Sequence, residues 1–220
     1  LLDLDFRAPS LCSAFKSDKE YWVNDYVNRV CEIDSVLTDC SPKYVMKGKL
    51  FVGLANPSTV AIREMSSKDR KWGMEALGRL LSLKTSLLND MHFDYVIFDT
   101  SPGLQYSSIN AIISADVVLV VMVMDKSDVE GTQRMIHDLY ELFEKKTGII
   151  VNKVPVEFLS SKTGKRNPIQ LEIYQLPIIR TIPCFCDILK TGGEYVFAFE
   201  ETEHPFTKAL ERIAAKIEHF

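Results

Sequence analysis

The sequence contains no long hydrophobic run and no large excess of charge of either sign. Its longest purely apolar segment is Val117–Met124, whereas a membrane-spanning helix needs about 20 such residues. The formal net charge at pH 7 is -4, which argues against a surface built throughout to bind nucleic acid. We therefore expect no membrane partner, and any contact with DNA must be confined to a local basic patch.

Cysteine is also scarce. The 5 cysteines are odd in number and irregularly spaced in a chain of 220 residues, which is long enough to need no disulfides. Hydrophobic residues make up 46% of the chain and charged residues 25%, the balance of an ordinary globular domain. The sequence thus predicts a single domain over residues 1–220, with reduced thiols, in the cytoplasm.

A glycine-rich phosphate-binding loop is the third absence. The nearest candidate, Thr163-Gly164-Lys165-Arg166, has no leading glycine and no serine or threonine after its lysine. It also lies in a polar segment, residues 160–168, that we expect to be a loop instead of a strand-to-helix connection. This motif therefore does not predict a phosphate site.

Runs of aliphatic and β-branched residues alternate with helical periodicity. This pattern predicts an α/β fold of three layers, with a mostly parallel sheet between helices. The runs around Ile97 and Val117 are apolar throughout, so we expect both of their faces to be buried. The expected strands cover residues 1–5, 50–55, 95–99, 117–124, 148–152 and 178–182, and the expected helices cover residues 69–88, 129–144 and 205–218.

Three carboxylates lie where two of these strands end. Asp3 and Asp5 share one face of the first strand, and Asp99 ends the strand around Ile97. Open α/β sheets bind ligands at the carboxyl ends of their strands, and carboxylate oxygens suit a hydrated Mg²⁺ beside a phosphate chain. A solvated strand end would explain Asp3 and Asp5 as well, and a helix cap would explain Asp99.

Five segments that follow one another along the chain carry a family resemblance. They are Leu-Leu-Asp-Leu-Asp-Phe-Arg-Ala-Pro-Ser-Leu from residue 1, Asp-Tyr-Val-Ile-Phe-Asp-Thr-Ser-Pro-Gly-Leu from residue 94, Ser-Ala-Asp-Val-Val-Leu-Val-Val from residue 114, Val-Asn-Lys-Val from residue 151, and Ile-Pro from residue 182. In this order they resemble the ParA/MinD family of deviant P-loop ATPases. The resemblance implies an ATPase that binds ATP and Mg²⁺, forms a homodimer bridged by ATP, responds to an activating partner protein and positions or partitions a cellular object.

The resemblance also implies roles for the strand-end residues. Asp99 would hold Mg²⁺ through a water, and Asp3 would support the metal shell. Asp5 would position or polarise the water that attacks the γ-phosphate. Pro102-Gly103 would form a switch loop that responds to the terminal phosphate.

The adenine base would be bound by residues further along the chain. Asn152 carries an amide that donates and accepts hydrogen bonds at once, and the matching asparagine reads the adenine edge in the family. On local grounds Asn152 is an equally good turn residue. Lys153 follows it, and the backbone just after Pro183 would close the other side of the base pocket.

In the family, a phosphate loop and the first strand precede the segment that Leu1 begins. A domain without that strand would have a gap in the middle of a parallel sheet, with unpaired backbone groups along it. We therefore expect the strand and the loop to lie upstream of Leu1 in a longer native protein, and we expect ATP binding of that longer protein.

Two other functions fit parts of the pattern. A noncatalytic regulatory paralogue would keep the fold with an incomplete nucleotide site. Arg7, after Asp5, also resembles the motif of the bacterial tyrosine kinases of this superfamily. Those kinases usually end in a tyrosine cluster, whereas the last tyrosine here, Tyr195, stands alone.

Two local features remain open. Cys184 and Cys186 could ligate a soft metal ion such as Zn²⁺, although one chain supplies only two ligands. Two groups of basic residues could bind DNA nonspecifically, as ParA-type proteins do, or could simply be solvated helix faces. The groups are Arg63, Lys68, Arg70, Lys71 and Arg79, and Lys162, Lys165 and Arg166.

Overall fold

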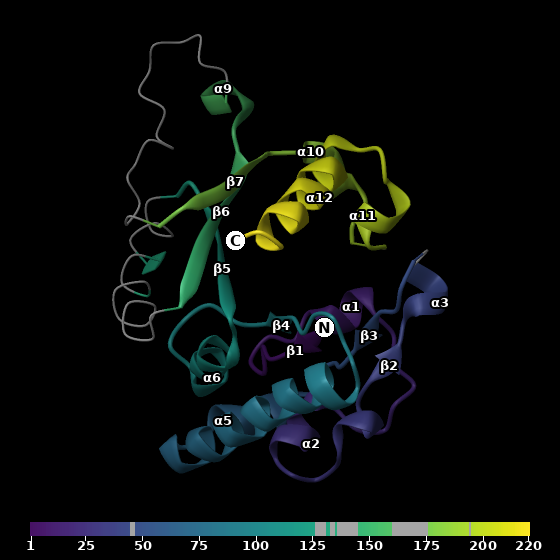
Figure 1. Ribbon diagram of the computed structural model, residues 1–220, viewed down its shortest axis with the longest axis vertical. Helices are drawn as coiled ribbons and strands as arrows, with labels where there is room; N and C mark the ends of the chain where they lie inside the picture. The colour runs from purple at the N-terminus through teal and green to yellow at the C-terminus, as the bar shows by residue number, and fades with distance from the viewer. Residues whose placement is uncertain (45–46, 126–130, 133–134, 136–144, 160–175, 194) are drawn as a thin grey trace. The chain divides into compact units, whose positions relative to one another are not determined.

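The computed structural model describes residues 1–44, 47–125, 131–132, 135, 145–159, 176–193 and 195–220 (Figure 1). The chain divides into two compact units, Leu1–Ala115 and Asp116–Phe220. The helix expected over residues 129–144 lies almost entirely outside the described residues, as does the loop expected over residues 160–168. Within the described ranges, no helix is long and apolar enough to cross a membrane.

The first unit contains a parallel pair of short strands, β1 and β4. Leu2 of β1 also forms a parallel bridge to Gly53, just beyond the end of β3, and β3 pairs with β2 in the antiparallel direction. β1 thus lies between β4 and the segment that follows β3. The strands are β1 (Leu2–Asp3), β2 (Thr38–Asp39), β3 (Phe51–Val52) and β4 (Phe98–Asp99).

The helices of this unit supply most of its core. The side chains of Leu2 and Leu4 are at most 1% exposed, and Leu80 and Leu83 of α5 belong to the same cluster. The helices and helical turns are α1 (Leu11–Ala14), α2 (Val23–Val27), the 3₁₀ turn η1 (Ile33–Ser35), α3 (Ser41–Tyr44), α4 (Thr59–Ser66), α5 (Arg70–Thr85), the π turn η2 (Ser86–Asp90) and α6 (Tyr106–Ser114).

The helix expected over residues 69–88 is confirmed as α5, with its end displaced. The Asp69 carboxylate caps it by accepting the backbone N–H of Trp72 at 2.9 Å. The α-helical hydrogen bonding stops at Thr85, and the backbone continues as η2. Leu87 in that turn is still buried, so the apolar pattern runs on although the helix type changes.

The second unit is built on three parallel strands in the order β5-β6-β7 (Figure 1). Helix α12 packs against β7, and its Ile213 joins Ile179 and Ile182 in one buried cluster. Pro205 occupies the first turn of α12, where proline is tolerated. The elements are β5 (Val117–Val123), β6 (Lys146–Val154), α9 (Val156–Leu159), β7 (Ile178–Pro183), α10 (Cys186–Lys190), α11 (Phe197–Glu200) and α12 (Pro205–Ile217).

The expectation that both faces of the central strands are buried is wrong for several side chains. Ile97, just before β4, is 59% exposed, and Val121 of β5 is 61% exposed. The alternate residues of β5, Val118 and Val120, are buried. Burial on both faces requires a covering layer on each side, and in β5 the side chains of Leu119 and Val121 are exposed.

Two glycines of α5 offer a matched test of its packing. A Cβ on Gly73 would lie 2.7 Å from the Tyr106 ring, whereas one on Gly78 would meet nothing within 4 Å. We predict that Gly73→Ala lowers the free energy of unfolding by about 1–2 kcal/mol, since overpacking outweighs the helical preference for alanine. Gly78→Ala should raise it by about 0.5–1 kcal/mol. Urea unfolding measures both, and stabilisation by both substitutions would contradict this packing.

Candidate functional site

The structure brings Asp3, Asp5 and Asp99 together at the carboxyl ends of β1 and β4. The strand register places Asp3 opposite Asp99, and the backbone N–H of Leu4 donates to the Asp99 carbonyl at 2.8 Å. Asp5 follows two residues later, and its backbone N–H donates to Asp3 Oδ1 at 3.0 Å. Three carboxylates predicted from strand ends therefore occupy one place in the fold.

This place is rich in negative charge and poor in solvent. Asp3 is 0% exposed; burial raises its pKa to about 6, and the neighbouring Asp99 and Asp5 carboxylates add to the rise against the opposing hydrogen bond from Asp5. The pKa of Asp99 is raised by burial and then by Asp5. Ionising the whole group is therefore costly unless a cation or further donors compensate.

Asp3 has one oxygen that no donor among the described residues satisfies. Its Oδ1 accepts from Asp5, but its buried Oδ2 has no hydrogen-bond partner there, and such an atom is costly inside a protein. Hard oxygen donors with unsatisfied acceptor capacity fit Mg²⁺. Among the described residues, no three carboxylates, thiols or imidazoles are grouped so that they could hold a metal ion by themselves.

Asp5 also shapes the loop that follows β1. Its Oδ1 accepts the backbone N–H of Arg7 at 3.1 Å and that of Ala8 at 3.0 Å. These two bonds close a turn around the carboxylate, so the orientation of Asp5 is fixed by its own chain. Arg7 itself is exposed.

The loop after Asp99 carries the predicted switch residues, Pro102 and Gly103. Gly103 has φ of +106°, a conformation that favours glycine. The loop is held at its start because Ser108 Oγ of α6 donates to the Ser101 carbonyl at 2.9 Å, with both serines buried. We did not predict this anchor from the sequence, in which two serines seven residues apart give no distinctive signal.

The predicted base-contacting residues meet in the second unit. Val154 of β6 lies opposite Pro183 of β7, and the Cys184 N–H donates to the Val154 carbonyl at 2.9 Å. Asn152 is half-buried, and its Oδ1 accepts the N–H of Lys153 at 2.9 Å. Lys153 has φ of +54°. Asn152, Lys153 and Pro183 thus cluster at the ends of two neighbouring strands, whereas the three carboxylates belong to the first unit.

Cys184 and Cys186 gain no third ligand from the part of the chain that the structure describes. The described residues hold no group of three potential metal ligands around them. Burial and then the neighbouring Cys186 raise the pKa of Cys184, which favours the thiol over the thiolate that Zn²⁺ requires. Within one chain this geometry does not support the metal interpretation.

Comparison with known proteins places the fold. A family model described as an AAA domain matches residues 57–152, and no curated protein matches the sequence. The cell division ATPase MinD of Pyrococcus furiosus superposes with a TM-score of 0.72 at 17% identity, over 99% of this chain and 84% of that one. An McdA-ATP complex from Cyanothece gives 0.65 at 16% identity, over 97% and 84%. A ParA family ATPase from Chlorobium tepidum gives 0.66 at 14% identity, over 97% and 81%.

The chain therefore has the α/β fold of the ParA/MinD ATPases, with a parallel sheet flanked by helices. The fold class predicted from the strand pattern is confirmed by these structures. The AAA-domain match begins just before α4 and ends within β6. The resemblance first seen in five short segments is thereby confirmed at the level of the fold.

The raised pKa of Asp3 predicts how stability depends on pH. The folded state holds a proton up to about pH 6, whereas an unfolded aspartate releases it near pH 4. The free energy of unfolding should therefore fall as the pH rises from about 4 to about 6, by on the order of 3 kcal/mol in metal-free buffer. Asp3→Asn should remove this fall and stabilise the protein above pH 6.

Urea unfolding at several pH values, with Asp94→Asn as the exposed control, measures the effect. Asp94 is exposed and precedes the strand that Asp99 ends. Its substitution should therefore leave the pH dependence of the free energy of unfolding the same as in the wild type. A pH profile of Asp3→Asn that matches the wild type would refute the assignment of the buried proton to Asp3.

Proposed function

We propose that this chain is the nucleotide-binding part of an ATPase of the ParA/MinD type, which binds ATP with Mg²⁺, dimerises around ATP and resets on hydrolysis. The observation that carries the proposal is the convergence of Asp3, Asp5 and Asp99 at the ends of two parallel strands. Support comes from the fold, since the similar MinD is named as an ATPase and the similar McdA was solved with ATP.

The carboxylates take different roles in this proposal. Asp99 would hold Mg²⁺ through a water and Asp3 would support the metal shell, and the ion would compensate the charge of the phosphate oxygens. Asp5 orients the attacking water, and its own orientation is fixed by the N–H groups of Arg7 and Ala8. Hydrolysis of this kind depends mainly on positioning and charge compensation, for which rigid carboxylates are suited.

Nucleotide binding and switching involve the remaining predicted residues. We assign the adenine edge to Asn152, with Lys153 beside it and the backbone after Pro183 on the other side of the base. Pro102 and Gly103 form the loop that senses the terminal phosphate, turning about the anchored Ser101. The assignment is supported by the position of each group at the carboxyl end of a parallel strand.

Residues 1–220 contain no glycine-rich P-loop, so the residues that would cradle the phosphates are not among those assigned above. We propose that residues 1–220 belong to one nucleotide-binding domain. A noncatalytic paralogue would lack the loop. Equilibrium dialysis of the native protein with ATP and Mg²⁺ distinguishes the two, because only the first binds the nucleotide.

The cellular role that we propose is positioning or partitioning in the cytoplasm, with an activating partner protein and a DNA surface. Two of the basic residues considered for DNA binding, Arg79 and Lys68, already have partners within the protein. Arg79 donates to the carbonyls of Tyr26 and Cys31 at 3.1 and 3.2 Å, and Lys68 pairs with Glu64 at 2.8 Å. The exposed members of that group are Arg63, Arg70 and Lys71; the second group lies outside the described residues.

The role of Asp5 is tested in the native protein by two substitutions. Asp5→Ala should leave ATP binding largely intact, lower the rate of phosphate release by about 100-fold or more, and prolong the ATP-bound dimer. Asp5→Asn keeps an acceptor for the N–H groups of Arg7 and Ala8, so it preserves the turn and should still lose hydrolysis. An unchanged rate of ATP hydrolysis in Asp5→Asn would contradict the role given to this carboxylate.

DNA binding is tested by its dependence on salt. The triple variant Arg63→Gln, Arg70→Gln and Lys71→Gln should weaken binding to random duplex DNA. It should also reduce the slope of log affinity against log salt by about one for each phosphate that the variant no longer neutralises. Lys190→Gln, on α10 of the other unit, serves as the control. Binding with an unchanged slope would place the DNA surface elsewhere, and no binding at low salt would remove DNA as a partner.

A further inference from the structure

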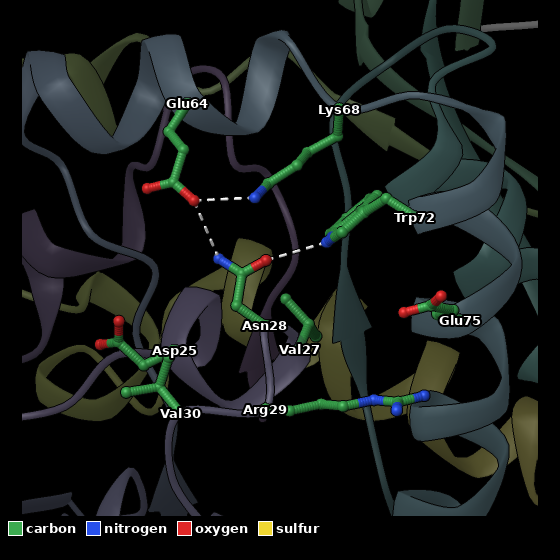
Figure 2. A pocket seen from close by; sticks show the side chains of 9 residues that line it. All are labelled: Asp25, Val27, Asn28, Arg29, Val30, Glu64, Lys68, Trp72 and Glu75. Carbon is green, nitrogen blue, oxygen red and sulfur yellow. Dashed lines mark hydrogen bonds and ion pairs between the residues drawn. The ribbon is translucent and has the colours of Figure 1, made fainter.

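A cavity in the first unit is lined by none of the carboxylates or base-contacting residues assigned above. It opens between the end of α2 and the facing sides of α4 and α5, and Figure 2 shows the side chains that line it. Its volume is about 380 Å³, which is within the range of small-molecule sites. Trp72 and Glu75 reach it from α5, and Asn28 and Arg29 reach it from the end of α2.

One wall of the cavity is fixed by a chain of polar contacts. The Trp72 indole N–H donates to Asn28 Oδ1 at 2.8 Å, and Asn28 Nδ2 donates to Glu64 Oε1 at 3.4 Å. Glu64 in turn pairs with the Lys68 ammonium at 2.8 Å, as the dashed lines in Figure 2 show. The indole is therefore held in one orientation, and the charge of Lys68 is already compensated.

Two opposite charges in the same cavity are not compensated by any described residue. Arg29 and Glu75 are both exposed and both line it, yet across the described ranges neither side chain forms an ion pair or hydrogen bond. In Figure 2 the Arg29 side chain extends from the end of α2 toward α5, the helix that carries Glu75. A ligand with one charge would satisfy one of them; a ligand with both charges can satisfy the two together.

Arg29 has a backbone conformation that is unusual for an arginine. Its N–H donates to the Tyr26 carbonyl at 3.0 Å, and the next N–H, of Val30, donates to the Asp25 carbonyl at 2.9 Å. This pair of bonds ends α2 with Arg29 in the left-handed region, at φ of +64°, where glycine is the preferred residue. The chain thus keeps an arginine at a position where glycine would be more stable.

We propose that this cavity binds a small zwitterion of the α-amino acid type, with an apolar or aromatic side chain. The Arg29 guanidinium binds the carboxylate through two parallel N–H···O bonds, and the Glu75 carboxylate accepts from the ammonium group. The ligand side chain packs on the Trp72 indole and on Val30, which is 63% exposed at the rim. The site shares no residue with the proposed nucleotide site, so its test does not depend on ATP.

The probe is L-phenylalanine, compared with N-acetyl-L-phenylalanine and L-phenylalanine amide. Each derivative lacks one of the two charges and keeps the ring. In a Trp22→Phe background Trp72 is the single tryptophan, so its fluorescence reports binding, and calorimetry gives the affinity. We expect L-phenylalanine to bind and each derivative to bind about tenfold or more weakly. Equal affinities of all three, or no binding of L-phenylalanine at millimolar concentrations, would overturn the proposal.

Two variants assign the charges. Arg29→Gly and Glu75→Gln should each weaken L-phenylalanine binding by about tenfold or more, whereas Lys49→Gln, at an exposed position of the same unit outside the cavity, should not. Arg29→Gly should also raise the urea midpoint, because glycine suits the left-handed backbone. Weaker binding in a more stable variant cannot result from unfolding. Unchanged binding in Arg29→Gly would show that the guanidinium holds no ligand.

Discussion

The arrangement on which the proposed chemistry depends is the parallel pairing that places Asp3 opposite Asp99. It brings two carboxylates to the same end of neighbouring strands, and Asp5 joins them through a backbone hydrogen bond to Asp3. Apolar residues before each of them keep the strands in the core, so the carboxylates lie at the edge of buried structure. The fold therefore creates a demand for positive charge at one place, which an ion with its own waters can meet.

The same arrangement costs stability. A buried carboxylate whose pKa is raised to about 6 disfavours the folded state at neutral pH relative to an amide in the same place. One of its oxygens also has no donor among the described residues. Functional sites commonly carry such costs because selection acts on the chemistry of the site as well as on stability. The proposed metal site is therefore supported by the raised pKa and the unsatisfied oxygen of Asp3 as well as by the family resemblance.

Much of the fold could be predicted because periodicity is local. The apolar runs predicted β5, β6 and β7, and the repeat of leucines predicted α5, whose start at Asp69 follows from its cap. The strands of the first unit could not be bounded in this way: β1 and β4 are far shorter than the apolar runs that contain them, because pairing requires a neighbour as well as a suitable sequence. The exposure of Ile97 and Val121 was missed for a related reason, since burial depends on what packs against a side chain.

Site residues that stand at a strand end could be predicted from the sequence. Contacts between segments that are distant in the sequence could not be predicted. Asp3 and Asp99 follow from alternation and strand order, whereas the unsatisfied oxygen of Asp3 and the anchor from Ser108 to Ser101 appear only in three dimensions. The cavity beside Trp72 is a stronger example. Asn28 and Trp72, which meet beside it, are 44 residues apart in sequence, and neither belongs to a recognisable motif.

Left-handed backbone by itself does not mark a functional position in this chain. His92 has φ of +56°, and the next N–H, of Phe93, donates to the Leu87 carbonyl at 3.0 Å, so His92 ends a helical segment much as Arg29 ends α2. The two differ in what the side chain does, since Arg29 lines a cavity together with the carboxylate of Glu75. The evidence for a ligand at that cavity is therefore the two charges, which no described residue pairs. The left-handed backbone of Arg29 adds no evidence for a ligand. It means only that Arg29→Gly removes the guanidinium while relieving backbone strain.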